Sequence, residues 1–373
     1  MADLPESILV DPFPERIVGY CTNVHAGATL DEYQTSLAKH VPNIRRRLGL
    51  EGPMPIGLWL SNESVSQVRH APMHDEYWDW FDQQNLTCFT FNAFPYGDFH
   101  ENVVKHKVYR PDWSDLDRVN YTCNLLQCLR SPENERHEIS ISTVPVGWGK
   151  DWSTEKLQSV LSHLSKTMDS LGTYLTNFDI HVDLEPEPGC YLDRSEDVVA
   201  FFDQHLVPSF GENPVLNLIR VCHDICHAAV MFEDQAEMFK RYDDAGIRIG
   251  KVQVSNAIRV DFDALSSQEK PEALRQLKAF QEDRYLHQTC IRDNASGKIT
   301  FHEDLPLATR AAEEQGEPIG EWRVHFHVPI YLESFGLLGT TRDYIDDCLE
   351  LMKPKKDVKH FEVETYAWNV LPE

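Results

Sequence analysis

Two apolar segments that each end on an acidic residue constrain the fold of this chain most strongly. The residues DIHVDLE, at 179–185, predict a buried strand that ends on Glu185, and IRVCHD, at 219–224, predicts another that ends on Asp224. His227 follows Asp224 about one helical turn later. Strands that deliver acidic groups at their carboxyl ends are typical of an α/β barrel with a divalent-metal site at its mouth.

Short apolar segments alternate with longer amphipathic segments along the rest of the chain. Thr29 is the expected N-cap of a first helix and Gly49 its expected stop, and further helices are expected at 63–86, 112–130 and 152–172. Regular βα alternation predicts a parallel sheet, and eight units would close a barrel. We therefore expect residues 1–373 to form a single (β/α)8 TIM barrel domain. Its strands are expected at 17–23, 55–61, 87–94, 137–148, 178–185, 217–222, 251–256 and 360–368.

A ninth strand candidate complicates this count. RVHFHVPIY, at 323–331, shows a strand pattern like that of KVQVSN, at 251–256, and the charged segment between them contains a hairpin-like signal. We interpret 257–320 as a lid-like insertion in the seventh unit. Either KVQVSN or RVHFHVPIY then supplies the seventh barrel strand, or the two share that position.

Composition excludes several classes of function. The net charge is −25, with no run of basic residues longer than 45–47, whereas binding to a nucleic acid duplex needs a basic face. No segment approaches the roughly 18 apolar residues of a membrane span, and MADLPESILVDPFPER lacks the apolar core of a signal peptide. The nine cysteines include no CxxC pair and are expected to be buried, reduced thiols. We expect a cytoplasmic protein without nucleic acid partners or membrane insertion.

Two pairs of polar residues near the end of the chain each share one strand face. His325 and His327 alternate with apolar residues, so the apolar face is expected to be buried and the histidine face to line a cavity. Glu362 and Glu364 likewise share a face of the last expected strand. A carboxylate pair is costly in a sealed core, and it fits an open barrel mouth that holds metal.

Together, the acidic residues and one imidazole form an oxygen-rich ligand set that suits Mn²⁺, Mg²⁺, Co²⁺ or Zn²⁺. Each residue also has a structural explanation: Glu185 as a salt-bridge partner, Asp224 as a helix N-cap and His227 as a hydrogen-bonded core histidine. Polar residues on loops after the expected strands are candidates for substrate contact. They are Asn23, His25, Asn92, Tyr96, His100 and Trp148.

These segments resemble the xylose-isomerase-like TIM barrels, a group that includes sugar-phosphate isomerases, ketose 3-epimerases and endonuclease IV. The matching residues, in chain order, are Glu185, the Asp224-x-x-His227 pair, HFHV at 325–328 and Glu364. The resemblance implies that Glu185, Asp224, His327 and Glu364 bind one divalent metal ion. It also implies that Glu185 and Glu364 exchange protons with the substrate, and that His227 and His325 lie near it.

One residue departs from that pattern. In the epimerases, the metal-binding histidine comes directly after the helix that follows strand six. Gln253 holds that place here. Gln253 is therefore an alternative seventh-strand ligand, and if it is the true one, His327 needs another explanation.

More closely, the chain resembles the EboE-type metabolite traffic proteins. The supporting segments are GYCTNVHAG, FTFNAFPYGDFH, HFHVPIY and HFEVETYAWNVLP. The resemblance implies a small-molecule metabolite as ligand, and it is compatible with partners in a metabolite export pathway. Two hypotheses follow: a metal-dependent isomerase or epimerase of a sugar or related hydroxy-carbonyl metabolite, and a non-catalytic metabolite carrier that uses the same site. A DNA repair activity like that of endonuclease IV is disfavoured by the acidic charge.

Overall fold

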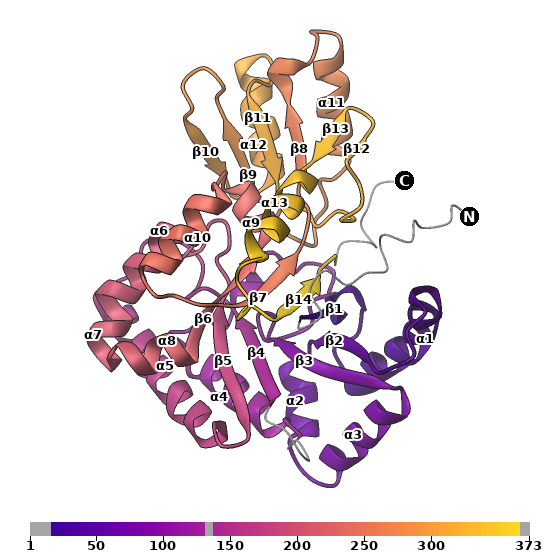
Figure 1. Ribbon diagram of the computed structural model, residues 1–373. Coiled ribbons are helices and arrows are strands. Elements are labelled where there is room, and N and C mark those ends of the chain that lie inside the picture. The colour runs from indigo at the N-terminus through magenta and orange to yellow at the C-terminus, as the bar shows by residue number, and fades with distance from the viewer. Residues whose placement is uncertain (1–15, 131–136, 366–373) are drawn as a thin grey trace.

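Eight parallel strands close a barrel in the order β1-β14-β7-β6-β5-β4-β3-β2, which confirms the expected TIM barrel (Figure 1). The computed structural model describes residues 16–130 and 137–365. The N-terminal segment that was expected to lack a signal peptide, and residues 366–368 of the last expected strand, lie outside these ranges. The barrel strands are β1 (Ile17–Cys21), β2 (Met54–Leu58), β3 (Leu86–Asn92), β4 (His137–Thr143), β5 (Phe178–Leu184), β6 (Ile219–Asp224), β7 (Ile249–Val254) and β14 (His360–Val363).

Helices connect the barrel strands. Thr29 caps α1 in a capping box, and Gly49 ends it at a φ of 64°, as predicted. The helix expected at 63–86 is instead two helices, and Pro72, which disfavours helical geometry at the residue before it, lies between them. The helices of the barrel are α1 (Leu30–Leu48), α2 (Asn62–Val68), α3 (Met73–Gln83), α4 (Leu116–Gln127), α5 (Thr154–Tyr174), α6 (Ser195–Phe201), α7 (Val207–Phe210), α8 (Glu212–Leu218), α9 (Ile225–Val230), α10 (Gln235–Asp244) and α13 (Arg342–Met352).

The segment KVQVSN supplies the seventh barrel strand, because β7 pairs in parallel with both β6 and β14. RVHFHVPIY does not enter the barrel. Its first residues belong to β11, which pairs antiparallel with β8 and β9 in a second sheet of order β10-β9-β11-β8-β13-β12. The strands of this sheet are β8 (Ile258–Asp261), β9 (Thr289–Arg292), β10 (Ile299–His302), β11 (Glu321–Val324), β12 (Ser334–Phe335) and β13 (Leu338–Thr340).

The second sheet therefore spans 258–340 and extends beyond residue 320, where the insertion was expected to end. We call 258–340 the insertion. It has its own apolar core, to which helices α11 (Glu269–Lys278) and α12 (Leu305–Gln315) contribute. The boundary was placed too early because β11 has the same alternating pattern as a barrel strand, although its hydrogen-bond partners are the antiparallel strands β8 and β9.

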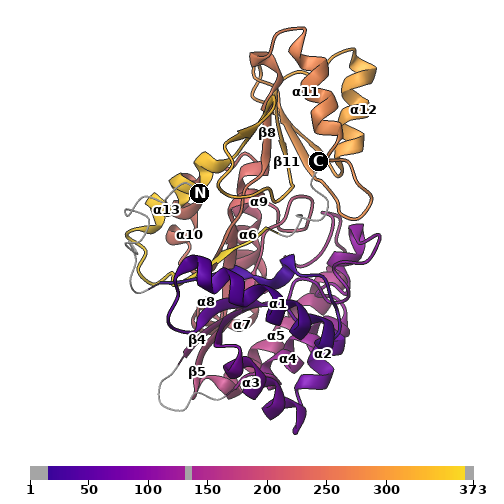
Figure 2. The same cartoon turned by 90° about the vertical axis from the view of Figure 1, so that its right-hand side faces the viewer.

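The insertion stacks on one end of the barrel (Figures 1 and 2). Contacts with the loop between β3 and α4 hold it there. The Tyr285 hydroxyl donates to the Phe99 carbonyl at 3.1 Å, the Val104 amide donates to the Arg284 carbonyl at 2.8 Å, and Lys105 forms an ion pair with Asp304 at 2.6 Å. The outer face of this end of the barrel is thus joined to the insertion by polar contacts.

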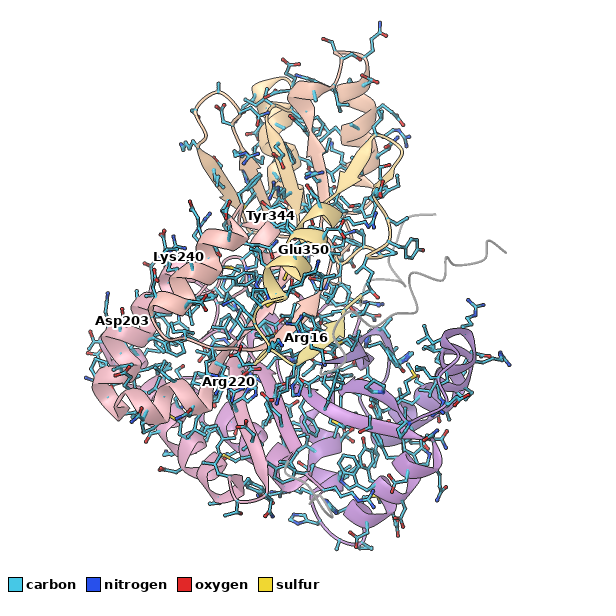
Figure 3. The ribbon with its side chains drawn as sticks, in the orientation of Figure 1. Arg16, Asp203, Arg220, Lys240, Tyr344 and Glu350 are labelled. Carbon is cyan, nitrogen blue, oxygen red and sulfur yellow. The ribbon has the colours of Figure 1, made fainter. Side chains whose placement is uncertain are left out.

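Charged and polar side chains fill much of the barrel interior. Lys251 and Glu362 form an ion pair of 2.5 Å with both side chains fully buried, and Asn92 hydrogen-bonds to each of them. Near the start of β6, the buried Arg220 binds Glu138 at 2.8 Å (Figure 3). Buried charges are tolerated when they are paired and hydrogen-bonded, so this network fixes which side chains face inward.

All nine cysteines are free thiols, and seven of them are buried. Among the described residues, no helix combines the length and the apolar character needed to cross a bilayer.

Gly57 on β2 makes room for the buried Glu362 side chain. A Cβ at this position would come within 1.4 Å of Glu362 Oε1. We expect Gly57→Ala to lower the free energy of unfolding by about 1–3 kcal/mol, because Glu362 must move while it stays paired with Lys251. Gly52→Ala is the matched control, since its added Cβ meets nothing within 4 Å. Urea unfolding measures both variants, and equal midpoints would contradict the expectation.

Candidate metal centre

Three carboxylates from separate strands meet at the barrel mouth. Glu185 directly follows β5, Asp224 ends β6 and Glu364 directly follows β14. One oxygen of each lies within 4.8 Å of those of the other two, and all three residues are buried. The structure therefore brings together the three acidic residues that the sequence predicted to converge. Like charges this close strongly disfavour simultaneous ionisation unless protons or cations compensate them.

The two oxygens of Asp224 have different surroundings. Oδ1 accepts from the His227 backbone amide at 2.9 Å and from the Ser255 hydroxyl at 2.7 Å, so it caps α9. Oδ2 is buried and has no hydrogen-bond partner among the described residues. The N-cap role therefore accounts for Asp224 Oδ1 but not for Oδ2. A buried oxygen without a hydrogen bond needs another explanation, and a cation ligand is one that fits.

His327 reaches the carboxylates from the insertion rather than from the barrel. Its Nε2 lies 3.9 Å from Asp224 Oδ2, and its Nδ1 lies 3.7 Å from Glu364 Oε2. The apolar residues that alternate with it, Phe326 and Val328, pack in the core of the insertion, as the alternation predicted.

Gln253, the alternative seventh-strand ligand, lies on β7 and engages the buried Lys251–Glu362 pair. With its amide nitrogen facing Glu362 and its oxygen facing Lys251, the distances are 3.0 and 3.2 Å. The imidazole of His327, from the insertion, is thus the group that lies between two of the three carboxylates.

Glu187 is a site residue that the sequence analysis missed. Its Oε2 lies 2.9 Å from His227 Nε2, and its Oε1 accepts from the Tyr109 hydroxyl at 2.9 Å. Its position two residues after Glu185, in the extended EPEP segment, was an available signal, because alternate residues of an extended chain share a face. Glu187, His227 and His325 also form a group whose ligand atoms lie within 4.8 Å of one another.

Burial and neighbouring charges separate the pKa values of the three carboxyl groups. Burial raises the pKa of Glu185 to about 7; the positive charge of His227 opposes this shift and Asp224 reinforces it. Burial also raises the pKa of Glu364 well above its ordinary value, and the charges of Glu185 and Asp224 add to the effect. Burial opposes ionisation of Asp224 too, yet the charges of His227 and His327 and two hydrogen bonds lower its pKa. Asp224 is therefore the most readily ionised of the three.

The pKa values of His227, His325 and His327 also differ from one another. Burial disfavours the charged form of His227, but the charges of Asp224 and Glu187 outweigh it and raise its pKa well above the ordinary value. Burial lowers the pKa of His327 to about 4 and holds that of His325 well below its usual range. Both are neutral imidazoles at neutral pH, which is the form that binds metal.

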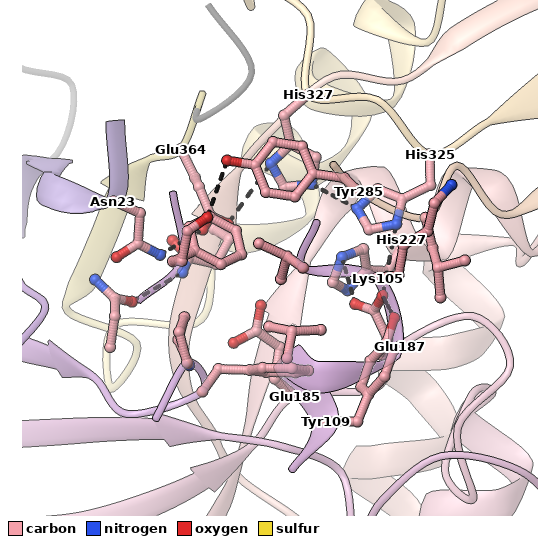
Figure 4. A pocket seen from close by; sticks show the side chains of 18 residues that line it. Asn23, Lys105, Tyr109, Glu185, Glu187, His227, Tyr285, His325, His327 and Glu364 are labelled. Atoms are coloured by element: carbon pink, nitrogen blue, oxygen red, sulfur yellow. Dashed lines mark hydrogen bonds and ion pairs between the residues drawn. The ribbon is translucent and has the colours of Figure 1, made fainter. Parts of the chain in front are cut away.

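A pocket with an empty volume of about 580 Å³, open solvent included, lies above the carboxylates (Figure 4). Residues from the barrel, the β3–α4 loop and the insertion line it. Its polar and titratable lining residues are Asn23, Asn92, Glu185, Glu187, His227, Gln253, His325, His327 and Glu364, and the remaining lining residues are Phe94, Pro95, Phe99, Val104, Lys105, Val108, Tyr109, Tyr285 and Leu286. The lining therefore combines a titratable set with a largely apolar set.

The other predicted substrate contacts lie away from this pocket's described lining. His25 stacks on His40, with ring centroids 4.8 Å apart, and Tyr96 packs against Tyr121 and lines a neighbouring hollow. Trp148 packs against Tyr109, with centroids 4.7 Å apart, so it supports the pocket wall from behind. The polar character of loops is too general a signal to show which loop residues reach a pocket.

The donor set fits a divalent cation. Three carboxylates offer hard oxygen ligands of the kind that Mg²⁺ and Mn²⁺ prefer, and His327 adds an imidazole that also suits Co²⁺ or Zn²⁺. The orphaned Asp224 Oδ2 and the close approach of three acidic groups are the observations that favour a cation here.

Comparison with solved structures supports the fold. No family model matches the chain, and no curated protein sequence does. A xylose isomerase-like TIM barrel protein from Mycobacterium smegmatis, solved in complex with magnesium, has a TM-score of 0.50 and 10% identity, over 94% of this chain and 90% of that one. The fold is accordingly that of the xylose isomerase-like TIM barrels.

Two further solved structures are similar at lower scores. The D-allulose 3-epimerase from Methylomonas sp. has a TM-score of 0.39 and 14% identity, over 65% of this chain and 73% of that one. The 3-keto-D-glucoside 4-epimerase YcjR from E. coli has a TM-score of 0.39 and 13% identity, over 80% of this chain and 98% of that one.

Chelator-treated protein should lose stability as the pH rises. A carboxyl group whose pKa is raised in the folded state holds a proton that the unfolded chain releases, so its contribution to stability falls between the ordinary value near 4.5 and the folded value of about 7 for Glu185. We expect a lower unfolding temperature at pH 8 than at pH 5.5, a smaller difference in Glu185→Gln, and recovery at pH 8 when Mn²⁺ is added. Scanning calorimetry with and without Mn²⁺ measures this. A wild-type difference that Glu185→Gln leaves unchanged would contradict it.

Proposed function

We propose that this protein is a divalent-metal-dependent isomerase or epimerase of a small hydroxy-carbonyl metabolite, such as a sugar. The observation that carries the proposal is the convergence of Glu185, Asp224 and Glu364 at the floor of a covered pocket. Asp224 favours the ionised form, whereas Glu185 and Glu364 have raised pKa values. Carboxyl groups tuned toward neutral pH are suited to accept and return protons.

Glu185 and Glu364 are the proposed proton-transfer residues. They extend from β5 and β14, between which β6 and β7 lie in the barrel wall, so they approach a bound molecule from different directions. Ionised Glu185 accepts the proton from the carbon next to a carbonyl. Glu364, in its acid form, donates a proton to the opposite face of that carbon in an epimerisation. In an isomerisation it donates to the neighbouring carbon, while the proton of the substrate hydroxyl passes to the former carbonyl oxygen. Exchange with solvent returns both groups to their starting forms.

The proposed metal ligands are Glu185, Asp224, His327 and Glu364. When bound, a divalent cation supplies a Lewis acid that polarises the carbonyl and stabilises negative charge on the substrate oxygens. Asp224 is held in place by its Oδ1 hydrogen bonds, so its Oδ2 is presented in a fixed direction. Asn23 donates to Glu364 at 3.3 Å and orients that carboxylate.

The rest of the pocket binds and encloses the metabolite. His227 and His325 line the pocket, as does Asn92, which also belongs to the interior network around Glu362. Tyr285 and Leu286 of the insertion close the pocket from above, which keeps water away from the proton-transfer step. Among the described residues, the lining contains one lysine, Lys105, and no arginine, so it does not suit a polyanionic substrate such as DNA.

A carrier function is the second candidate, and the position of Gln253 favours it. Gln253 holds the place where the resembling epimerases have their barrel-borne histidine, and it is engaged with Lys251 and Glu362 instead. A protein of this kind would hold its metabolite in the same pocket without converting it and deliver it to processing or export partners, as the EboE-type resemblance implies. Tight binding of a metabolite without conversion, with Mn²⁺, Co²⁺ or Zn²⁺ supplied, would favour this function.

Isosteric variants of the two glutamates test the catalytic proposal. Once screening of sugars and related hydroxy acids and ketones identifies a substrate, Glu185→Gln and Glu364→Gln should each lower kcat by about 10²–10⁴-fold, because an amide cannot exchange the proton. The exposed Glu76→Gln on α3 is the matched control and should leave kcat unchanged. Proton exchange from the substrate into deuterated water provides an independent readout. Full turnover in either variant would reject the assignment.

A further inference from the structure

The apolar lining of the pocket comes from two segments, the β3–α4 loop and the pair Tyr285 and Leu286 in the insertion (Figure 4). In the closed barrel, β3 stands across the ring from β7, whose neighbours β6 and β14 lead to Asp224 and Glu364. The loop after β3 therefore borders the mouth opposite the strands that deliver these two carboxylates. The lining residues of the loop, apart from Lys105, are Phe94, Pro95, Phe99, Val104, Val108 and Tyr109.

Backbone carbonyls at the start of this loop are bonded to groups within the protein. The Phe94 carbonyl accepts from the buried guanidinium of Arg118 at 3.0 Å, and the Pro95 carbonyl accepts from the Trp59 indole at 3.1 Å. Each carbonyl is thus occupied by a buried side chain. What Phe94 and Pro95 offer to a ligand is mainly the apolar surface of their side chains.

The two tyrosine hydroxyls of the lining are engaged in the same way. The Tyr285 hydroxyl donates to the Phe99 carbonyl at 3.1 Å, and the two rings pack with centroids 5.1 Å apart. The Tyr109 hydroxyl donates to Glu187 Oε1 at 2.9 Å and accepts from the Gln288 amide at 2.7 Å. Both tyrosines therefore contribute ring surface to the pocket, while their hydroxyls serve the protein.

Lys105 is the only lysine or arginine of the described lining, and its charge is already paired. Its Nζ forms an ion pair with Asp304 at 2.6 Å and donates to the Glu282 carbonyl at 3.4 Å. An anionic group on a ligand would have to compete with Asp304 for this lysine. A buried anion without a partner is costly, so the lining disfavours a phosphate ester or a carboxylate at this end of the ligand.

We propose that the metabolite is an uncharged hydroxy-carbonyl compound whose remote part is apolar, such as an aryl or a branched alkyl group. This inference rests on the proposed function, because the hydroxy-carbonyl unit is the part that faces the metal centre. Burial of an apolar remainder against the loop and the insertion is favourable. Burial of a chain of hydroxyl groups there is unfavourable, because the hydrogen bonds that they lose to water are not replaced.

A free sugar that places its C–H face against the same lining is the alternative. The hydroxyls next to its reacting carbon have partners at the metal centre, where Asn23 Oδ1, which has no partner among the described residues, lies beside Glu364. The more distant hydroxyls would face the loop, whose polar groups named above are bonded elsewhere. The two alternatives therefore differ in which ligand binds more tightly.

Calorimetric titration of the Mg²⁺-loaded full-length protein measures this preference with ligands that share a hydroxymethyl ketone unit. Benzyl hydroxymethyl ketone carries an aryl remainder, L-erythrulose and D-fructose carry hydroxyls, and dihydroxyacetone phosphate carries an anion. We expect the benzyl ketone to bind about 10–100-fold more tightly than L-erythrulose, as burial of a phenyl group predicts. Neither D-fructose nor dihydroxyacetone phosphate should bind more tightly than L-erythrulose.

An isosteric pair of variants connects the preference to the lining. Val104→Thr places a hydroxyl in the apolar lining and should lower the affinity for the benzyl ketone about 10-fold. Val103→Thr is the matched control, because Val103 is 46% exposed and outside the described lining, and it should leave the affinity unchanged. Leu286→Asn repeats the test from the insertion and replaces Val104→Thr if that variant does not fold.

The inference is overturned if the benzyl ketone binds no more tightly than L-erythrulose, undetectable binding included, or if folded Val104→Thr and Leu286→Asn both keep the full preference. Tighter binding of the benzyl ketone without its conversion supports the inference and counts against the proposed function. Conversion of L-erythrulose by a protein that does not prefer the benzyl ketone supports the proposed function and rejects the inference. Proton exchange from each ligand into deuterated water reports conversion independently of binding.

Discussion

The balance of charge inside the barrel is the constraint on which the rest of the site depends. Lys251, a buried cation on β7, forms an ion pair with Glu362 at 2.5 Å and bonds to Asn92. Its positive charge is therefore already paired one layer below the mouth. The carboxylates of Glu185, Asp224 and Glu364 above it must then be balanced by protons, by the imidazolium of His227 or by an added cation. Burial, reinforced by the neighbouring carboxylates, raises the pKa values of Glu185 and Glu364. The mouth therefore favours protonated carboxyl groups or a bound cation over three uncompensated carboxylates.

The backbone is shaped to admit these charges. At Gly57, a side chain would occupy the space of the Glu362 carboxylate, and at Gly250, where β7 departs from regular pairing with β6, a Cβ would lie 2.3 Å from Asp183 Oδ1. Glycine therefore stands at these two strand positions, where a side chain would otherwise lie, and the carboxylates fit inside the barrel wall. Each buried carboxylate in turn needs a partner, and the partners extend to Asn92 and His181. The buried polar groups therefore lie in hydrogen-bonded clusters below the mouth.

Sequence predicted the barrel and its acidic residues well, because both signals are local. A strand that ends on Glu185 or Asp224 is visible in a few consecutive residues, and closure of eight parallel strands then places their carboxyl ends together. Two other features depend on pairing between distant strands: where the insertion ends, and that His327 reaches the site from the insertion and not from a barrel strand. β11 pairs with β8 about sixty residues earlier, and its alternation is the same in an antiparallel sheet as in a barrel. The spacing of Glu187 from Glu185 was a local signal for this residue, but only the folded chain shows that His227 lies beside it.

The candidate site combines side chains from the barrel and from the insertion, which have separate apolar cores. The barrel supplies the carboxylates, while the insertion supplies His325 and His327 and closes the pocket with Tyr285. Polar contacts such as Lys105–Asp304 hold the insertion to the β3–α4 loop. A cation bound by groups from both the barrel and the insertion would strengthen this attachment, because its coordination requires the insertion to stay over the mouth. Metal binding and closure of the pocket are then thermodynamically coupled, so each favours the other.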